Sequence, residues 1–440
     1  MQHGADHIGC TGYRNLHTQS RRDFMKVGVI AGLGLSLGDY FKIMDANAQS
    51  GAARAESCIF IFCAGGMSHV DTFDPKPYSP IEYRGELGTV ATNTGEVFGA
   101  PMKNMASVAD KLTVLRSVTH GEAAHERGTH NMLTGYKPSP AIVYPSMGSV
   151  ISHEFGPRND LPAYIAIPGA GDPFMGTGYL SSAFGPFSVG GDPVNKGFQV
   201  RDLNLAGGVS PERMEGRKGL LATVDHHFSS MEKTDVLEAM DSYYQRAYAL
   251  ISSQKAREAF DLSGEPDAVK DRYGRTGMGQ RLLLSRRLVE AGARFITVVD
   301  GGYDMHVNIK GSMQATGTAL DQAVATLVSD LSERGMLEKT LVVLTTEFGR
   351  TVRINKDAGR DHWPKAFSVV LAGGGLKGGM IHGSTDAYGS EPNRDPIGPA
   401  DISATIFNQL GVDIHKKLMS DGNRPIDIVN GGTVIAPVVA

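Results

Sequence analysis

The sequence predicts an α/β fold built on a mostly parallel central sheet, with a helical insertion. Short continuous runs of apolar residues recur along the chain, and such runs are typical of strands buried on both faces of a parallel sheet. In the C-terminal half these runs alternate with segments of helical periodicity, which is the pattern of right-handed βαβ units. The chain of 440 residues, of which 41% are hydrophobic and 20% charged, is large enough to bury such a sheet.

The first predicted strand covers residues 58–63, an apolar run that ends ahead of the glycine pair Gly65 and Gly66. A loop dense in Ser, His and Asp follows these glycines. Ligand sites of α/β proteins lie just beyond the carboxyl ends of the strands. We therefore expect this loop to bring polar side chains to that edge of the sheet, namely His69, Asp71 and Asp74.

Two further strands are predicted at residues 111–118 and 161–168. The first of them runs into a segment that we interpret as a loop with three histidines, His120, His125 and His130. Residues 78–104 and 169–208 are predicted to be irregular, the second because it is rich in Gly and Pro.

The helical insertion is predicted at about residues 210–290, inserted in the α/β core or packed on it. It opens at Ser210 and Pro211, an N-cap followed by proline at the first helical position. Beyond it the alternation becomes regular, with helices at 280–291, 318–334 and 401–410 and strands at 294–299, 340–346 and 367–372.

Three more polar clusters lie next to these later strands. Asp304 and His306 follow the strand at 294–299, and being two apart they face the same side of an extended backbone. A carboxylate and an imidazole on one side suit a divalent metal such as zinc, although a turn Asp and a surface His would look the same. Glu347 directly follows a buried strand, where it needs a metal, a proton or a positive partner such as Arg350.

The last cluster is the run Arg360-Asp361-His362, just ahead of the strand at 367–372. Here we expect Asp361 to orient the second ring nitrogen of His362. Together the clusters predict a site for one or two divalent metals (zinc, calcium or magnesium) with ligands from His69, Asp71, Asp304, His306, Glu347 and His362. Arg350 and Arg360 are predicted to bind the anionic group of a substrate, because guanidinium forks match oxyanions.

The N-terminus predicts export. Residues 20–26, Ser-Arg-Arg-Asp-Phe-Met-Lys, resemble a twin-arginine signal. The apolar segment at 27–37 is too short to span a membrane, and the small residues at 46–48 suit a signal peptidase. We expect residues 1–48 to be a signal peptide, residues 49–440 to form one domain, and the twin-arginine translocase to deliver the chain to the periplasm. The alternative is a cytosolic protein with a chance pair of arginines.

Charge and cysteine content bear on nucleic-acid binding, membrane binding and disulfide formation. A net charge of −4 offers no electrostatic footprint for nucleic acid or an anionic membrane surface. No membrane span is predicted in the mature chain. Its two cysteines, Cys58 and Cys63, lie five apart on one predicted strand, point to opposite faces and cannot form a disulfide with each other.

The clusters also resemble a known family. The Arg-Arg-Asp-Phe start and residues 65–77, 116–120, 301–306, 347–351 and 359–364 are similar to a large exported bacterial family called domain of unknown function 1501. That family is placed in the alkaline phosphatase and sulfatase superfamily. The resemblance implies a three-layer α/β/α sandwich with a metal site at the edge of its central sheet.

The resemblance implies roles for some residues, whereas at other positions this sequence differs from the superfamily pattern. Asp304, His306 and His362 look like the superfamily's Asp and His ligands, and Glu347 stands where a ligand Asp opens an Asp-His pair. The acidic pair that ends the first strand of sulfatases is replaced by Ala and Gly. Thr129 to Tyr136 is similar to a sulfatase stretch, and it places His125 at the position of the modified cysteine.

An imidazole at position 125 cannot become the formylglycine of a sulfatase. It can accept a phosphoryl group or transfer a proton, so His125 and His120 are the predicted catalytic residues. The resulting hypothesis is an exported, metal-dependent hydrolase of sulfate or phosphate esters on small molecules or polysaccharides. The alternative is a non-catalytic, sulfatase-like binding or scaffold protein of the periplasm.

Overall fold

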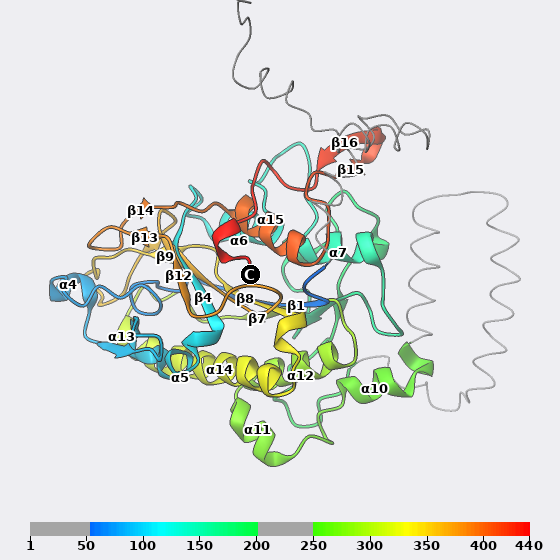
Figure 1. The fold of residues 1–440 in the computed structure, drawn as a ribbon, viewed down its shortest axis with the longest axis horizontal. Coiled ribbons are helices and arrows are strands. Elements are labelled where there is room, and N and C mark those ends of the chain that lie inside the picture. The colour runs from blue at the N-terminus through cyan, green and yellow to red at the C-terminus, as the bar shows by residue number, and fades with distance from the viewer. Residues whose placement is uncertain (1–52, 201–249) are drawn as a thin grey trace, which may run out of the picture. The chain divides into compact units, whose positions relative to one another are not determined.

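A computed structural model describes residues 53–200 and 250–440. The described chain forms an eight-stranded sheet between two layers of helices, which confirms the predicted α/β/α sandwich (Figure 1). In spatial order the strands are β12 (Met380–His382), β4 (Leu112–Val118), β11 (Phe367–Ala372), β8 (Thr340–Thr345), β1 (Ser57–Cys63), β7 (Phe295–Asp300), β5 (Tyr164–Ile167) and β6 (Phe187–Ser188).

The first strand lies at the centre of the sheet. β1 pairs in parallel with both β7 and β8, with Ile59 opposite Ile296 on one side and Val342 on the other. All seven residues of β1 are buried. Ile59 and Ile61 face one hydrophobic core, whereas Phe60 and Phe62 face the other. A strand covered on both faces has to be apolar at every position, which is why its sequence is a continuous run.

One helical layer packs on the β1 face that carries Ile59. It comprises α5 (Lys103–Ser107), α10 (Gln254–Phe260), α11 (Asp267–Tyr273), α12 (Gly277–Glu290), α13 (Ile309–Ser312) and α14 (Thr318–Glu333). The opposite face is covered by α6 (His125–Thr134), α7 (Met147–Phe155) and α15 (Pro399–Gln409). Cys58 and Cys63 belong to different cores and are both free, as their spacing predicts.

One strand of the sheet runs against the others. β11 is antiparallel to both of its neighbours, β4 and β8, while the remaining pairs are parallel. The sequence predicts the strand at 367–372 but places it in a βαβ series, and the structure corrects its direction. The reversal matters because the segment that enters β11 starts from the edge where the parallel strands end.

Other elements differ from the prediction in detail. The segment 78–104, predicted to be irregular, contains α4 (Ile81–Arg84), β2 (Thr89–Ala91) and β3 (Val97–Gly99). His125 begins a helix instead of lying in a loop. Asp401 is the third residue of α15, where its carboxylate accepts the N–H of the N-cap Gly398. Small two-stranded ladders complete the chain: β9 (Gly349–Arg350) with β10 (His362–Trp363), β13 (Ser384–Thr385) with β14 (Pro392–Arg394), and β15 (Lys417–Ser420) with β16 (Arg424–Asp427).

Some predictions fall outside the described residues. These are the signal peptide at 1–48 and the predicted helix start at Ser210. Of the predicted helical segment at 210–290, the described part contains α10, α11 and α12. No helix in the described ranges is sufficiently long and apolar to cross a membrane.

The glycines after β1 allow two loops to touch. Gly65 has φ of 119°, and a Cβ there would lie 2.4 Å from the backbone nitrogen of Asp304. Neither backbone can move aside easily, since each loop continues a central strand. The glycine therefore lets the loop after β1 pack directly on the loop after β7.

We expect Gly65→Ala to lower the free energy of unfolding by about 3 kcal/mol or more, because backbone strain and a backbone clash add. Gly95→Ala is the matched control, since Gly95 has φ of 88° and open space around its Cα. That control should cost about 1–2 kcal/mol. Urea unfolding of both variants measures the difference, and equal losses would contradict the close approach.

Candidate metal centre

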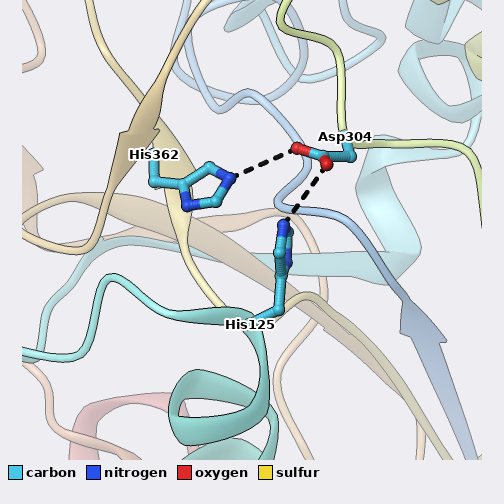
Figure 2. Close-up of side chains that lie close together, drawn as sticks. All are labelled: His125, Asp304 and His362. Atoms are coloured by element: carbon cyan, nitrogen blue, oxygen red, sulfur yellow. Dashed lines mark hydrogen bonds and ion pairs between the residues drawn. The ribbon is translucent and has the colours of Figure 1, made fainter.

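Three polar side chains converge at the edge where the parallel strands end. Asp304 lies in the loop after β7, His125 begins the helix that follows β4, and His362 lies in β10 just before β11. Each offers one donor atom, and these atoms all lie within 4.8 Å of one another (Figure 2). In Figure 2 both imidazoles point at the Asp304 carboxylate from different sides.

His306 lies beside this group, in the same loop as Asp304. Its Nε2 lies 3.1 Å from Asp304 Oδ1 and 3.0 Å from His362 Nε2. His362 Nε2 is 3.3 Å from the same carboxylate oxygen, and His125 Nε2 is 3.4 Å from Asp304 Oδ2. The compact group therefore consists of the His125, Asp304 and His362 donor atoms, and His306 Nε2 adjoins it beside Asp304 and His362.

The partners of the other ring nitrogens decide which tautomers are present. His362 Nδ1 donates to the Ala123 carbonyl at 2.8 Å, and His306 Nδ1 donates to Asp361 at 2.9 Å. A carbonyl only accepts, and so does an ionised carboxylate, so each Nδ1 carries a hydrogen. The pKa of Asp361 lies below its usual value because of its hydrogen bond from His306, which keeps it an acceptor.

The Nδ1 of His125 also carries a hydrogen, because it too faces an acceptor. Its Nδ1 donates to Glu347 Oε1 at 2.6 Å, and this bond raises the pKa of the imidazole. In neutral rings the three Nε2 atoms therefore all present lone pairs toward the Asp304 carboxylate. Lone pairs at such distances repel unless a proton or a cation lies among them. Acceptors on the far nitrogen are the usual arrangement of histidines that bind metal.

The Asp304 carboxylate is kept ionised by its surroundings. Desolvation would raise its pKa, but the Arg350 guanidinium, 2.5 Å away, outweighs that effect and lowers the pKa to about 2. An anionic oxygen is thus available as a ligand across the physiological range.

The donor set fits a divalent transition metal. Imidazole nitrogens with one carboxylate suit zinc and similar ions, whereas calcium and magnesium prefer oxygen ligands. The side chains of Asp304 and His306 are 49% and 42% exposed, so the centre is open on one side. Structural zinc sites are closed, and catalytic ones keep an open position.

The structure does not bring His69 and Asp71 to this centre. Both are buried, at 1% and 2% exposure. His69 Nε2 lies 2.7 Å from the Gly389 carbonyl, and Asp71 pairs with Arg360 at 2.7 Å. Asp74, the third polar residue of that loop, pairs with Lys76. The loop after β1 thus folds into the protein, and its polar residues hold neighbouring segments.

The two arginines predicted to bind substrate are also internal. Arg350 and Arg360 are 0% exposed. All three nitrogens of Arg350 donate to protein oxygens, among them the carbonyls of Gly65, Gly66 and Arg360. Those of Arg360 donate to Asp71 and to three backbone carbonyls. Both guanidinium groups therefore anchor loops, and neither faces the open side of the centre.

Glu347 and His120 lie behind the centre. Glu347 is 1% exposed and contacts His125 instead of joining the converging donor atoms. His120 uses both ring nitrogens, because Nε2 donates to the Glu347 carbonyl at 2.6 Å and Nδ1 accepts the N–H of Glu122 at 3.0 Å. Burial lowers the pKa of His120. Its predicted role in proton transfer would require one of these bonds to open.

The orienting partners of two histidines differ from the sequence prediction. Asp361 is predicted to orient His362, but the structure places it against His306 Nδ1 instead. His362 is oriented by the carbonyl of Ala123, and a backbone carbonyl leaves no trace in the sequence. The run Arg360-Asp361-His362 was the available signal for Asp361.

A family model fits the chain from residue 55 to residue 439, and its description is "Protein of unknown function (DUF1501)". The chain belongs to this family. The match covers every residue of the centre and confirms the resemblance seen in the sequence. Comparison with curated proteins finds no match.

Several solved structures are similar to this member of the family. Lipoteichoic acid synthase LtaP from Listeria monocytogenes is 10% identical, with 88% of this chain and 80% of that chain covered and a TM-score of 0.37. The PsFucS1 sulfatase from Pseudoalteromonas sp. is 12% identical, with 85% of this chain and 70% of that chain covered and a TM-score of 0.36. The phosphonate monoester hydrolase SpPMH from Silicibacter pomeroyi is 12% identical, with 87% of this chain and 76% of that chain covered and a TM-score of 0.37. Likeness at this level does not bear on the substrate of this chain.

We expect Arg350→Ala to destabilise the protein by about 3–5 kcal/mol, because it leaves buried carbonyls and the Asp304 carboxylate without their partner. Arg127→Ala is the control: Arg127 is 52% exposed and pairs with Glu122, so its loss should leave the melting temperature nearly unchanged. Differential scanning calorimetry of both variants checks this. An Arg350→Ala protein as stable as the wild type would show that the guanidinium is free to serve a ligand.

Proposed function

We propose that this protein is an exported, metal-dependent hydrolase of sulfate or phosphate esters, with polysaccharide esters among its substrates. One observation carries the proposal. The donor atoms of His125, His362 and Asp304 converge, His306 Nε2 lies beside two of them, and the Nδ1 of each of the three imidazoles is already hydrogen-bonded. These four side chains would hold the cation. When bound, a divalent cation supplies Lewis-acid chemistry for the oxygens of an anionic ester.

The protein's own groups prepare the centre for that role. Asp361, Glu347 and the Ala123 carbonyl fix the orientation of the three imidazoles. Arg350 keeps Asp304 ionised. The exposed edges of Asp304 and His306 leave room for an ester to approach from solvent. Because these side chains are oriented before the substrate binds, no free energy has to be spent on reorienting them during the reaction.

The position of His125 bears on the mechanism. Its Nδ1 donates to Glu347 and its Nε2 points at Asp304, so it belongs with the cation ligands and has no nitrogen left for covalent catalysis. We therefore assign the reaction to direct attack of water on sulfur or phosphorus. Water adds to the central atom, the ester bond breaks, and the released alcohol takes up one of the water protons.

One observation favours the non-catalytic alternative. The arginines expected to bind the substrate anion are wholly internal. A binding or scaffold protein could keep the metal centre and lack turnover. In that alternative the polar clusters can also be structural ion pairs without a metal, so metal content and hydrolysis both have to be measured.

We expect the purified protein to contain about one zinc-like ion per chain and to hydrolyse p-nitrophenyl sulfate or bis-p-nitrophenyl phosphate. His306→Ala should lose at least about tenfold in metal affinity and most of the activity. His415→Ala, a change at an exposed histidine remote from the centre in sequence, is the control. Mass spectrometry of the metal content and a chromogenic assay decide the matter. Full metal occupancy without turnover, or no bound metal, would reject the hydrolase and favour the scaffold.

Export through the twin-arginine pathway is part of the proposal. Arg21 and Arg22 lie outside the described residues and are needed by the translocase if the signal is genuine. Changing both to lysine should retain the protein in the cytoplasm. Cell fractionation followed by immunoblotting measures this, and unchanged periplasmic delivery would contradict the proposed route.

A further inference from the structure

Glu347 lies where β8 ends, buried beneath the metal centre. Its Oε1 accepts hydrogen bonds from His125 Nδ1 at 2.6 Å and from the Gly65 N–H at 2.7 Å. Its Oε2 lies 3.0 Å from the Thr346 hydroxyl. We propose that Glu347 is a positioning residue, which fixes His125 as a cation ligand and does not itself bind the cation. This inference rests on the proposed function, since it concerns the same centre.

The surroundings of Glu347 hold it in this place. Its carbonyl accepts from His120, so the backbone is fixed as well as the side chain. Helix α6 also packs directly on this residue, because a Cβ on Gly128 would lie only 3.1 Å from the Glu347 carbonyl oxygen and 3.2 Å from its Cβ. His125 and Gly128 lie three residues apart on one face of α6. The glycine thus brings the helix close enough for His125 to reach the carboxylate.

The charge of Glu347 also points toward His125. Within the described ranges, the salt bridge of this carboxylate is to His125, and no lysine or arginine pairs with it. A buried carboxylate needs a compensating positive charge. A cation held by the opposite ring nitrogen, which faces Asp304, would supply that charge through the imidazole. A carboxylate behind a ligating histidine fixes the tautomer and makes the ring a better donor.

The ring of His125 is held from its sides as well. Its centroid lies 5.1 Å from that of Phe348 and 4.4 Å from that of His362. These contacts restrict where the ring can lie, whereas the hydrogen bond to Glu347 places the hydrogen on Nδ1. The two functions can therefore be separated by a substitution that keeps the shape and removes the charge.

Glu347→Gln is that substitution. A glutamine oxygen can still accept from His125 and Gly65. Its NH₂ group can donate to the second lone pair of Thr346 Oγ1, which accepts the Met67 N–H at 2.9 Å and gives its own hydrogen to the Cys63 carbonyl at 2.7 Å. The variant should fold normally, with a melting temperature of the metal-free protein close to that of the wild type. We expect its affinity for Co²⁺ and Zn²⁺ to fall roughly 10–100-fold.

A double-mutant cycle tests whether Glu347 acts through His125. Co²⁺ affinity, followed by the visible absorption of the bound ion, is measured for the wild type, Glu347→Gln, His125→Ala and the double variant. Glu347→Gln should weaken binding in the wild type and have no further effect once His125 is gone. A further loss of similar size in the His125→Ala background would make Glu347 a ligand itself and overturn the proposal. Unchanged affinity in Glu347→Gln would also overturn it.

Asp361→Asn provides a matched comparison, because Asp361 stands behind His306 as Glu347 stands behind His125. It should be non-additive with His306→Ala and additive with Glu347→Gln. Glu391→Gln, at an exposed ion pair with Lys365, is the control and should leave Co²⁺ affinity unchanged. If the wild type binds Co²⁺ but hydrolyses no ester, the proposed function fails and the cycle still decides the role of Glu347. A wild type that binds neither ion overturns both.

Discussion

The buried guanidinium of Arg350 holds the site together. It donates to the carbonyls of Gly65 and Gly66 after β1 and to Asp304 after β7, and it also reaches the carbonyl of Arg360 before β10. Three segments far apart in the sequence thus share one charged group. A buried guanidinium destabilises the fold unless all its N–H groups are hydrogen-bonded. These loops therefore have little freedom to separate. The position of Asp304, and with it the candidate metal centre, follows from this one side chain.

The direction of β11 explains how His362 reaches the same place. In a uniformly parallel sheet, a residue just ahead of a strand would lie at the opposite edge from residues that follow the other strands. Because β11 runs against β4 and β8, its entry lies at their carboxyl ends. β10 pairs with β9, which sets His362 opposite Arg350. The centre is therefore a product of strand direction as much as of residue type.

The sequence predicts much of this architecture because its signals are local. Continuous apolar runs identify the strands, and their ends locate Asp304, His306 and Glu347. Whether an arginine points inward or outward depends on carbonyls from distant loops, so the burial of Arg350 and Arg360 could not be predicted. The inward fold of His69 and Asp71 has the same origin, since Gly389 and Arg360 are their partners. The tautomer of His362 depends on one backbone carbonyl, which no residue type reveals.

The open face of the centre has a consequence for how the protein would acquire its ion. Asp304 and His306 reach solvent directly, so a bound cation could leave and return without any part of the fold opening. Occupancy would then follow the free concentration of each metal in the surrounding medium and not the history of folding. The composition of the medium, as well as the ligands, would then select which ion occupies the centre.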